Sequence, residues 1–267
     1  MAFKICSIAS GSSGNCIYVG TDQVNILVDS GISGKRVALG LGEIGVDPTR
    51  LDGIFITHEH SDHIKGVGVL ARKYKIPIYA TKKTQQAVLN YRQIGKMEHA
   101  HFIEIRPDEN VTLKDMVIHP FRSFHDAIDP VCYTFLHDGK KISVATDLGC
   151  YDEYIVSKLV DSNVLFIEAN HDVKMLEVGG YPYFLKKRIL SDVGHLSNEL
   201  SGHLISSLYH QNLSHVILGH LSQENNFPEL AYEAVRAVLM DCAHVDHERL
   251  KLFVAGRNSN SKLVVVG

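Results

Sequence analysis

The sequence predicts an α/β fold in which two sets of strands pack as a sandwich with helices on the outside. Short apolar runs typical of strands alternate with longer amphipathic segments typical of helices. The strand-like runs form two groups, one mostly in each half of the chain. Each sheet must cover its apolar faces with the other sheet and with helices, which favours a sandwich. No linker rich in Pro, Gly or charge divides residues 1–267, so we expect a single domain.

In the first half of the chain, apolar runs bounded by Gly, Ser and Asp predict the secondary-structure elements. We expect strands at residues 3–8, 16–19, 24–28, 53–56 and 76–80. The pattern predicts helices over residues 33–44, 64–74 and 81–90, although Gly40 and Gly42 disfavour the first. The segment Ser10-Gly11-Ser12-Ser13-Gly14-Asn15 is a tight turn by composition. It is either a plain hairpin loop or a loop whose backbone amides lie near an anion.

The second half continues with β-type runs and then alternates helices and strands. We expect strands at residues 102–105, 116–121, 131–136, 141–145, 164–167, 216–218, 252–254 and 263–266. Helices are predicted over residues 151–160, 197–210 and 228–240. Residues 173–193 are the least regular, which suggests an insertion or a lid.

Composition limits the class of protein. The net charge of -3 gives no overall positive field of the kind that marks many nucleic-acid binders, although a local basic groove remains possible. Five scattered cysteines without a C-x-x-C pair argue against a disulfide framework or a cysteine zinc site and favour reduced thiols in a cytoplasmic protein. The N-terminus does not resemble a signal peptide, and no apolar run reaches the ~18 residues of a membrane-spanning helix.

The strongest chemical signal is the run of His58, His60, Asp62 and His63 directly after an apolar strand. Alternate side chains of an extended segment point the same way, so His58 and His60 can face one metal ion. Asp62 and His63 lie beyond the turn and can face a second. Three imidazoles and a carboxylate suit Zn²⁺, with Mn²⁺ or Fe²⁺ as alternatives. The competing interpretation is a histidine-rich surface loop.

Two metal ions need further ligands, and three candidates follow apolar runs in the same way. These are His125, Asp147 and His220. Each alone is more typical of a solvated turn residue. Together with the first run they make a plausible ligand set, because ligands in α/β sheets bind at the carboxyl ends of strands.

The run Thr57-His58-Glu59-His60-Ser61-Asp62-His63 resembles the signature of the metallo-β-lactamase superfamily, and Asp29 in Leu27-Val28-Asp29-Ser30-Gly31 resembles its first motif. The resemblance implies an αββα four-layer sandwich and two divalent metal ions. It implies that His58, His60 and His125 bind the first ion, that Asp62, His63 and His220 bind the second, and that Asp147 bridges them. Asp29 would orient a ligand by a hydrogen bond.

Further motifs narrow the resemblance. Glu168 after a strand and His195 before a helix precede His220, an order similar to the phosphodiesterase branch that includes ribonuclease Z. The segment of residues 9–15 and the stretch around Tyr181-Pro182 resemble the bacterial YycJ/WalJ group of nucleases. The chain lacks the Gly/Pro-rich arm of ribonuclease Z, which argues against tRNA maturation.

The resemblance and the residues together predict a phosphodiesterase, with a DNA exonuclease preferred and nucleic acid, DNA before RNA, as the partner. The expected nucleophile is a hydroxide that bridges the metal ions. The expected catalytic residues are Asp62, His195 and Glu168, with His195 as the general acid oriented by Glu168. The alternative for His195 is that it only starts its helix.

Lys186, Lys187 and Arg188 interleave with aromatic residues, a combination that suits a single strand or a frayed end. The alternative is a solvated loop face. Rival functions are a small-molecule phosphodiesterase or an ester or thioester hydrolase, a diiron redox protein, and a metal-stabilised binding module. Seven candidate ligands argue against the last, because a structural zinc site is normally closed with four.

Overall fold

The structure is a computed structural model that describes residues 2–97 and 99–267. The chain forms two compact units. Unit 1 comprises Met1–Arg122, Ala127–Gly139 and Gly256–Gly267, and unit 2 comprises Ser123–Asp126 and Lys140–Ala255. The predicted α/β class with two sheets is confirmed. The single-domain expectation stays a prediction.

Unit 1 contains a sheet of seven strands in the order β14-β1-β2-β3-β4-β5-β6. The neighbours from β3 to β6 are parallel, and the others are antiparallel. Three more strands of this unit, β7, β8 and β9, pair antiparallel. The strands are β1 (Phe3–Ala9), β2 (Cys16–Gly20), β3 (Asn25–Val28), β4 (Gly53–Phe55), β5 (Ile78–Ala80), β6 (Phe102–Glu104), β7 (Val111–Leu113), β8 (Met116–Arg122), β9 (Val131–His137) and β14 (Val264–Val266).

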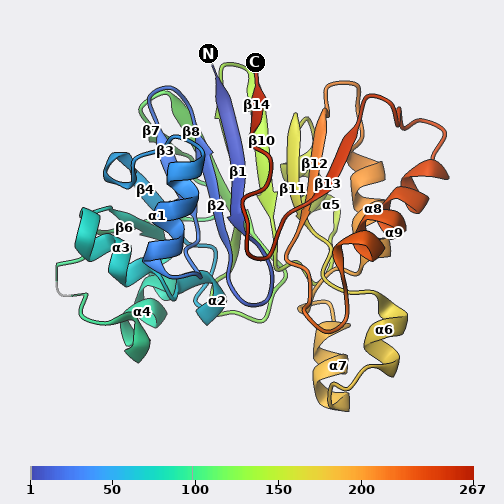
Figure 1. Cartoon of the computed structure of the whole chain (residues 1–267), viewed down its shortest axis with the longest axis horizontal. Coiled ribbons are helices and arrows are strands. Elements are labelled where there is room, and N and C mark those ends of the chain that lie inside the picture. The colour runs from blue at the N-terminus through green and yellow to red at the C-terminus, as the bar shows by residue number, and fades with distance from the viewer. Residues whose placement is uncertain (1, 98) are drawn as a thin grey trace. The chain divides into compact units, whose positions relative to one another are not determined.

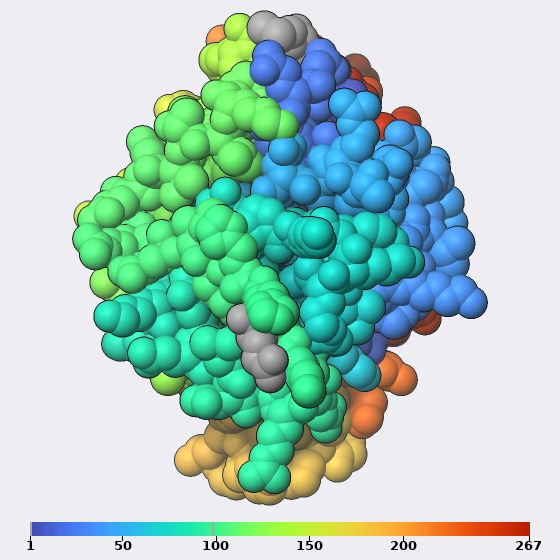
Figure 2. Space-filling view, turned by 90° about the vertical axis from the view of Figure 1, so that its left-hand side faces the viewer, coloured from blue at the N-terminus to red at the C-terminus, as the bar shows by residue number. Residues whose placement is uncertain are grey.

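The helices of unit 1 cover one face of its large sheet (Figure 1). They are α1 (Gly34–Glu43), α2 (Ser61–Ile64), α3 (Val67–Tyr74) and α4 (Lys82–Asn90), with short 3₁₀ turns at Pro48–Arg50 and Arg92–Ile94. In Figure 2 the blue and teal helical segments form much of the outer surface of this unit. Their apolar sides belong to a continuous buried core with the inner strands.

Aromatic side chains join the two strand sets within unit 1. Tyr133 of β9 packs edge-on against Phe55 of β4 at 5.7 Å between ring centroids, and Phe55 stacks on Tyr79 at 4.3 Å. The Tyr133 hydroxyl donates to the carbonyl of Ile56 at 2.6 Å. These contacts hold β4 in place just before the histidine run begins at residue 58.

Unit 2 contains four parallel strands in the order β13-β12-β11-β10. They are β10 (Lys140–Ala145), β11 (Val164–Glu168), β12 (His215–Gly219) and β13 (Lys251–Val254). Because parallel strands end at the same edge of a sheet, the residues that follow β10, β11 and β12 are brought together there.

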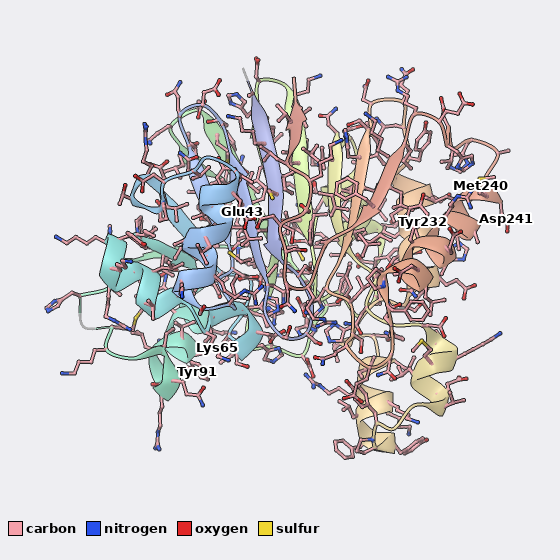
Figure 3. The ribbon with its side chains drawn as sticks, viewed as in Figure 1. Glu43, Lys65, Tyr91, Tyr232, Met240 and Asp241 are labelled. Carbon is pink, nitrogen blue, oxygen red and sulfur yellow. The ribbon has the colours of Figure 1, made fainter. Side chains whose placement is uncertain are left out.

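The helices of unit 2 are α5 (Glu153–Leu159), α6 (Val173–Val178), α7 (Tyr183–Ile189), α8 (Asn198–Leu208) and α9 (Pro228–Met240). The long helices α8 and α9 pack on each other and beside the strands (Figure 1). In Figure 3, Met240 and Asp241 lie at the outer end of α9, and both are exposed. The short helices α6 and α7 lie at the end of unit 2 where the strands have their carboxyl ends (Figure 1).

Two predicted segments differ from the structure. The helix predicted over residues 64–74 is two helices, α2 and α3, interrupted at Gly66, whose N–H donates to the carbonyl of Ser30 at 2.7 Å. A Cβ at Gly66 would lie 2.0 Å from the carbonyl oxygen of Ile32, so the backbones must meet there without a side chain. The irregular segment 173–193 contains α6 and α7.

Most of the other predicted elements are confirmed to within two or three residues, and β7 was not predicted. In the part of the chain that the structure describes, no helix has both the length and the apolar character needed to span a membrane.

Candidate metal centre

Four candidate ligands lie on the loop after β4 and in the short helix α2. His58 and His63 are buried, and His60 and Asp62 are partly exposed. His58 Nε2 lies 3.0 Å from His60 Nδ1, and His63 Nε2 lies 3.4 Å from an Asp62 carboxylate oxygen. Ligand atoms about 2 Å from one tetrahedral metal ion lie about 3.4 Å apart. The two pairs therefore have the spacing of atoms that could share ions.

Asp29 holds this loop in place from the end of β3. Its carboxylate accepts hydrogen bonds from the Thr57 N–H at 2.8 Å and from the Thr57 hydroxyl at 2.7 Å. The same carboxylate lies 2.7 Å from His63 Nδ1. The backbone of Asp29 has a φ of 59°, a left-handed conformation that is uncommon outside glycine. Asp29 lies where the sequence predicted an orienting residue.

Asn15 contacts the same histidine, which the sequence did not predict. Its amide nitrogen lies 3.2 Å from His63 Nε2, and its backbone N–H donates to the carbonyl of Asp62 at 2.8 Å. The Gly31 backbone approaches Asp62 so closely that a Cβ there would lie 1.5 Å from the Asp62 carbonyl oxygen. The turn composition of residues 10–15 carried no sign that one side chain would contact the histidine run.

In unit 2, three candidate residues lie at the ends of neighbouring parallel strands. Glu168 is the last residue of β11, Asp147 follows β10, and His220 follows β12. All three side chains are buried. Asp147 and His220 have φ values of 58° and 55°, so the chain turns sharply as it leaves these two strands. Such strained backbone is often found at functional sites.

Glu168 is the centre of the hydrogen bonds in this cluster. Its Oε2 lies 2.8 Å from Nδ1 of both His195 and His220, and its Oε1 accepts from the N–H groups of Leu148 and Leu196. Burial alone would raise the pKa of Glu168. The opposing charge of His195 and the hydrogen bonds from both histidines outweigh burial and hold that pKa well below its usual range.

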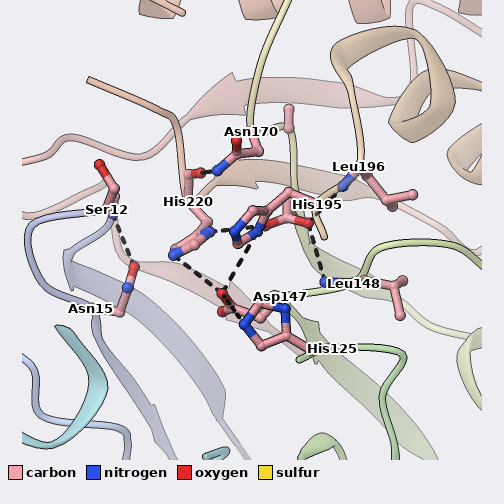
Figure 4. A network of polar contacts seen from close by, with 12 residues as sticks. Ser12, Asn15, His125, Asp147, Leu148, Asn170, His195, Leu196 and His220 are labelled. Carbon is pink, nitrogen blue, oxygen red and sulfur yellow. Dashed lines mark hydrogen bonds and ion pairs between the residues drawn. The ribbon is translucent and has the colours of Figure 1, made fainter. Parts of the chain in front are cut away.

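Asp147 lies between two imidazoles of unit 2. Its Oδ1 is 3.6 Å from His125 Nε2 and 3.4 Å from His220 Nε2, again the spacing expected of atoms that could share an ion. Asp147, Glu168, His195 and His220 can each offer a ligand atom, with all four atoms within 4.8 Å of one another. Figure 4 shows Asp147, His125, His195 and His220 converging on one point.

Five imidazoles of the candidate site share one arrangement. Each has Nδ1 within 3.1 Å of a protein oxygen: His58 beside the Thr57 hydroxyl, His63 beside Asp29, His125 beside the Gly194 carbonyl, and His195 and His220 beside Glu168. An oxygen at Nδ1 favours the tautomer that carries its proton there and directs the lone pair of Nε2 toward a ligand. Histidines that bind metals are usually held in this way, so the donor set fits divalent ions.

The three predicted substrate-binding residues lie on α7, and their contacts differ. Lys186 Nζ donates to the carbonyl of Glu177 at 2.7 Å, and Lys187 Nζ lies 5.3 Å from the centre of the Tyr183 ring. The Arg188 guanidinium donates two hydrogen bonds to Asp126. Lys187 is therefore the most open of the three toward a polyanion.

Comparison of the sequence with known proteins finds a matching family model and relatives that match most of the chain. Residues 24–220 match the family model described as "Beta-lactamase superfamily domain". The chain is 44% identical over 232 residues to Exodeoxyribonuclease WalJ of Streptococcus pneumoniae, covering 87% of this chain and 86% of that protein. It is 39% identical over 239 residues to Exodeoxyribonuclease YycJ of Bacillus anthracis, covering 90% of each.

Similarity of structure extends over the whole chain. The metallo-β-lactamase fold protein YhfI of Bacillus subtilis superposes with a TM-score of 0.73 at 15% identity, covering 100% of both chains. At that identity the likeness supports the fold alone. The predicted α/β sandwich and the resemblance from which it was drawn are both confirmed.

Proposed function

We propose that this chain, which belongs to the metallo-β-lactamase superfamily, is an exonuclease that hydrolyses phosphodiester bonds in DNA. The chain is a metal-dependent hydrolase by membership and by its relatives. The two relatives described above are named exodeoxyribonucleases, and they match this chain over most of its length. The observation that carries the proposal is the contact of Glu168 Oε2 with both His195 and His220, at 2.8 Å each. This contact orients the candidate general acid and a candidate metal ligand through one carboxylate.

The proposed ligands are those implied by the superfamily motifs. His58, His60 and His125 would hold one divalent ion, Asp62, His63 and His220 a second, and Asp147 would bind both. Zn²⁺ is the proposed metal, with Mn²⁺ or Fe²⁺ as alternatives, because imidazole and carboxylate suit all three. Support comes from the spacing of the ligand atoms within each unit and from the oxygen at Nδ1 of most of the histidines. We also propose Asp62 as a catalytic residue, as expected from the sequence.

When bound, two divalent ions would activate a water for attack at neutral pH and offset negative charge on the phosphate. The protein itself would supply the proton for the leaving oxygen. His195 is the proposed general acid, because Glu168 fixes its Nδ1 and so leaves Nε2 to carry the mobile proton. The side chain of His195 is 17% exposed, so a substrate can reach it.

Helix α7 is the proposed contact with the polynucleotide. Tyr183 and Phe184 are each 74% exposed, far more than aromatic side chains in a folded core, and Lys187 lies beside Tyr183. Exposed rings beside positive charge can stack with the bases of a single strand and attract its phosphates. We propose that Lys186 and Lys187 with these rings bind the strand end.

The first test replaces the general acid. We expect His195→Ala to retain its metal ions and to lower kcat on single-stranded DNA by about 10²- to 10⁴-fold, because the leaving oxygen loses its proton donor. The measurements are metal content by mass spectrometry and release of end label from DNA with Zn²⁺, Mn²⁺ or Fe²⁺.

The matched control is His203→Ala, an exposed histidine of α8, which should leave the turnover unchanged. Full turnover of His195→Ala would reject the general-acid role. A wild-type enzyme that cleaves bis-p-nitrophenyl phosphate but neither DNA nor RNA would favour the rival function of a small-molecule phosphodiesterase.

A further inference from the structure

An ion pair joins α7 to a segment far away in the sequence. Arg188 and Asp126 are 62 residues apart, and Arg188 donates from both Nε and Nη2 to the two carboxylate oxygens, with 2.9 Å between Nη2 and Oδ1. A paired contact of this kind fixes orientation as well as distance. Because Nε and Nη2 are both hydrogen-bonded to Asp126, the Arg188 guanidinium faces its own protein rather than a phosphate.

Asp126 directly follows the candidate ligand His125, and both are bonded to the segment before His195. The Asp126 N–H donates to the carbonyl of Val193 at 3.0 Å, and His125 Nδ1 lies 3.1 Å from the carbonyl of Gly194. The position of His125 is therefore set by the same short segment that leads into the candidate acid.

That segment is in turn attached to the end of α7. The His195 N–H donates to the carbonyl of Ile189 at 3.0 Å. A Cβ at Gly194 would lie 2.2 Å from the Ile189 carbonyl oxygen, and a Cβ at Gly149 would lie 2.4 Å from the Gly194 nitrogen. The backbones meet without intervening side chains, so a shift of the α7 end must displace its neighbours.

We propose that Arg188 is a positioning residue that acts through Asp126 to hold His125 and His195 in their working arrangement. This inference rests on the proposed function for the roles of the two histidines. The Arg188 and Asp126 side chains are 49% and 27% exposed, and ion pairs this open add little to global stability. The effect therefore falls on the geometry of the site rather than on folding.

Kinetics on a small diester separate positioning from substrate binding. We expect Arg188→Gln and Asp126→Asn each to lower kcat on bis-p-nitrophenyl phosphate about 10-fold, the size typical when a residue supporting a metal ligand is lost, with KM little changed. The double variant should be no slower than either single variant, because both remove the same contact.

The matched control is Arg236→Gln on α9. It also removes an exposed arginine that pairs with a carboxylate, Glu233, at 3.2 Å. We expect wild-type kcat. If Arg188→Gln keeps the same kcat as this control, the positioning role is overturned. It is also overturned if Arg188→Gln raises only KM for DNA while Asp126→Asn leaves kcat and KM unchanged.

A second readout needs no catalysis. In the metal-loaded wild type we expect the amide hydrogens of Asp126 and His195 to exchange slowly, and in Arg188→Gln and Asp126→Asn to exchange at least about 10-fold faster, with no change in Arg236→Gln. Unchanged exchange at both amides would overturn the inference even in an active enzyme. Faster exchange in a chain that cleaves no diester would reject the proposed function and leave the positioning contact standing.

Discussion

His171 is a buried histidine whose ring nitrogens have no hydrogen-bond partner among the described residues. The residue is 1% exposed, and burial lowers its pKa to about 4 against the opposing charges of Glu168 and Asp172. The unfolded chain takes up this proton near pH 6.5 and the folded chain only near pH 4. Unfolding therefore binds a proton between these values, and the stability of the folded chain falls as the pH falls through this window.

We expect His171→Phe to remove this acid sensitivity. Between pH 7.5 and pH 4 the wild type should lose on the order of 3 kcal/mol more unfolding free energy than the variant. Urea unfolding of both metal-free chains at each pH measures the difference. His203→Gln, which removes an exposed histidine of α8, should follow the wild type. Equal losses in wild type and His171→Phe would contradict the argument.

At the scale of single elements, two glycines of unit 1 should respond oppositely to the same change. Gly66→Ala, at the break between α2 and α3, places a Cβ 2.0 Å from the Ile32 carbonyl oxygen and should destabilise the fold by about 1–3 kcal/mol or more. Gly42→Ala in α1 meets no atom within 4 Å and should stabilise it by up to about 1 kcal/mol.

Urea unfolding at pH 7.5 compares the two glycine variants with the wild type. A Gly66→Ala protein as stable as the wild type would show that the α2–α3 break can relax, contrary to the close backbone approach. A loss of stability in Gly42→Ala would contradict the open surface found there.

Elements with a clear apolar run or period were predictable, whereas the short helices among turn-forming residues were not. The buried run of β11 and the amphipathic pattern of α9 identified both elements. The helices α6 and α7 have six and seven residues and flank Gly179-Gly180 and Pro182, which carry turn signals, so the sequence indicated only an irregular segment.

For the site, the sequence indicated what the residues could bind but not which contacts support them. The histidine run and the order of Glu168, His195 and His220 are local patterns at strand ends and could be recognised. The contact of Asn15 with His63 joins residues 48 apart, and Arg188 meets Asp126 across 62. Pairings over such separations depend on how the loops fold back, which composition does not encode.

For the whole molecule, metal removal should lower stability as well as activity. Two ions bound by the folded chain alone stabilise it by mass action, about 2.7 kcal/mol for each ion held at 100 times its dissociation constant. We therefore expect chelation to lower the Tm by roughly 10 °C or more and Zn²⁺ or Mn²⁺ to restore it. Circular dichroism melts of chelated and reloaded protein test this. Coincident melts would contradict metal binding by the folded state.

The left-handed backbone at Asp29, Asp147 and His220 has a consequence for mutagenesis. An alanine scan would remove the functional side chain and also leave a Cβ-bearing residue in a conformation that costs it about 1–2 kcal/mol. Loss of activity at these three positions would then mix chemistry with backbone relaxation. Asparagine tolerates this conformation and matches aspartate in size, so Asp29→Asn and Asp147→Asn isolate the contribution of each carboxylate charge. At His58 and His125, which lack the positive φ, alanine remains a clean probe.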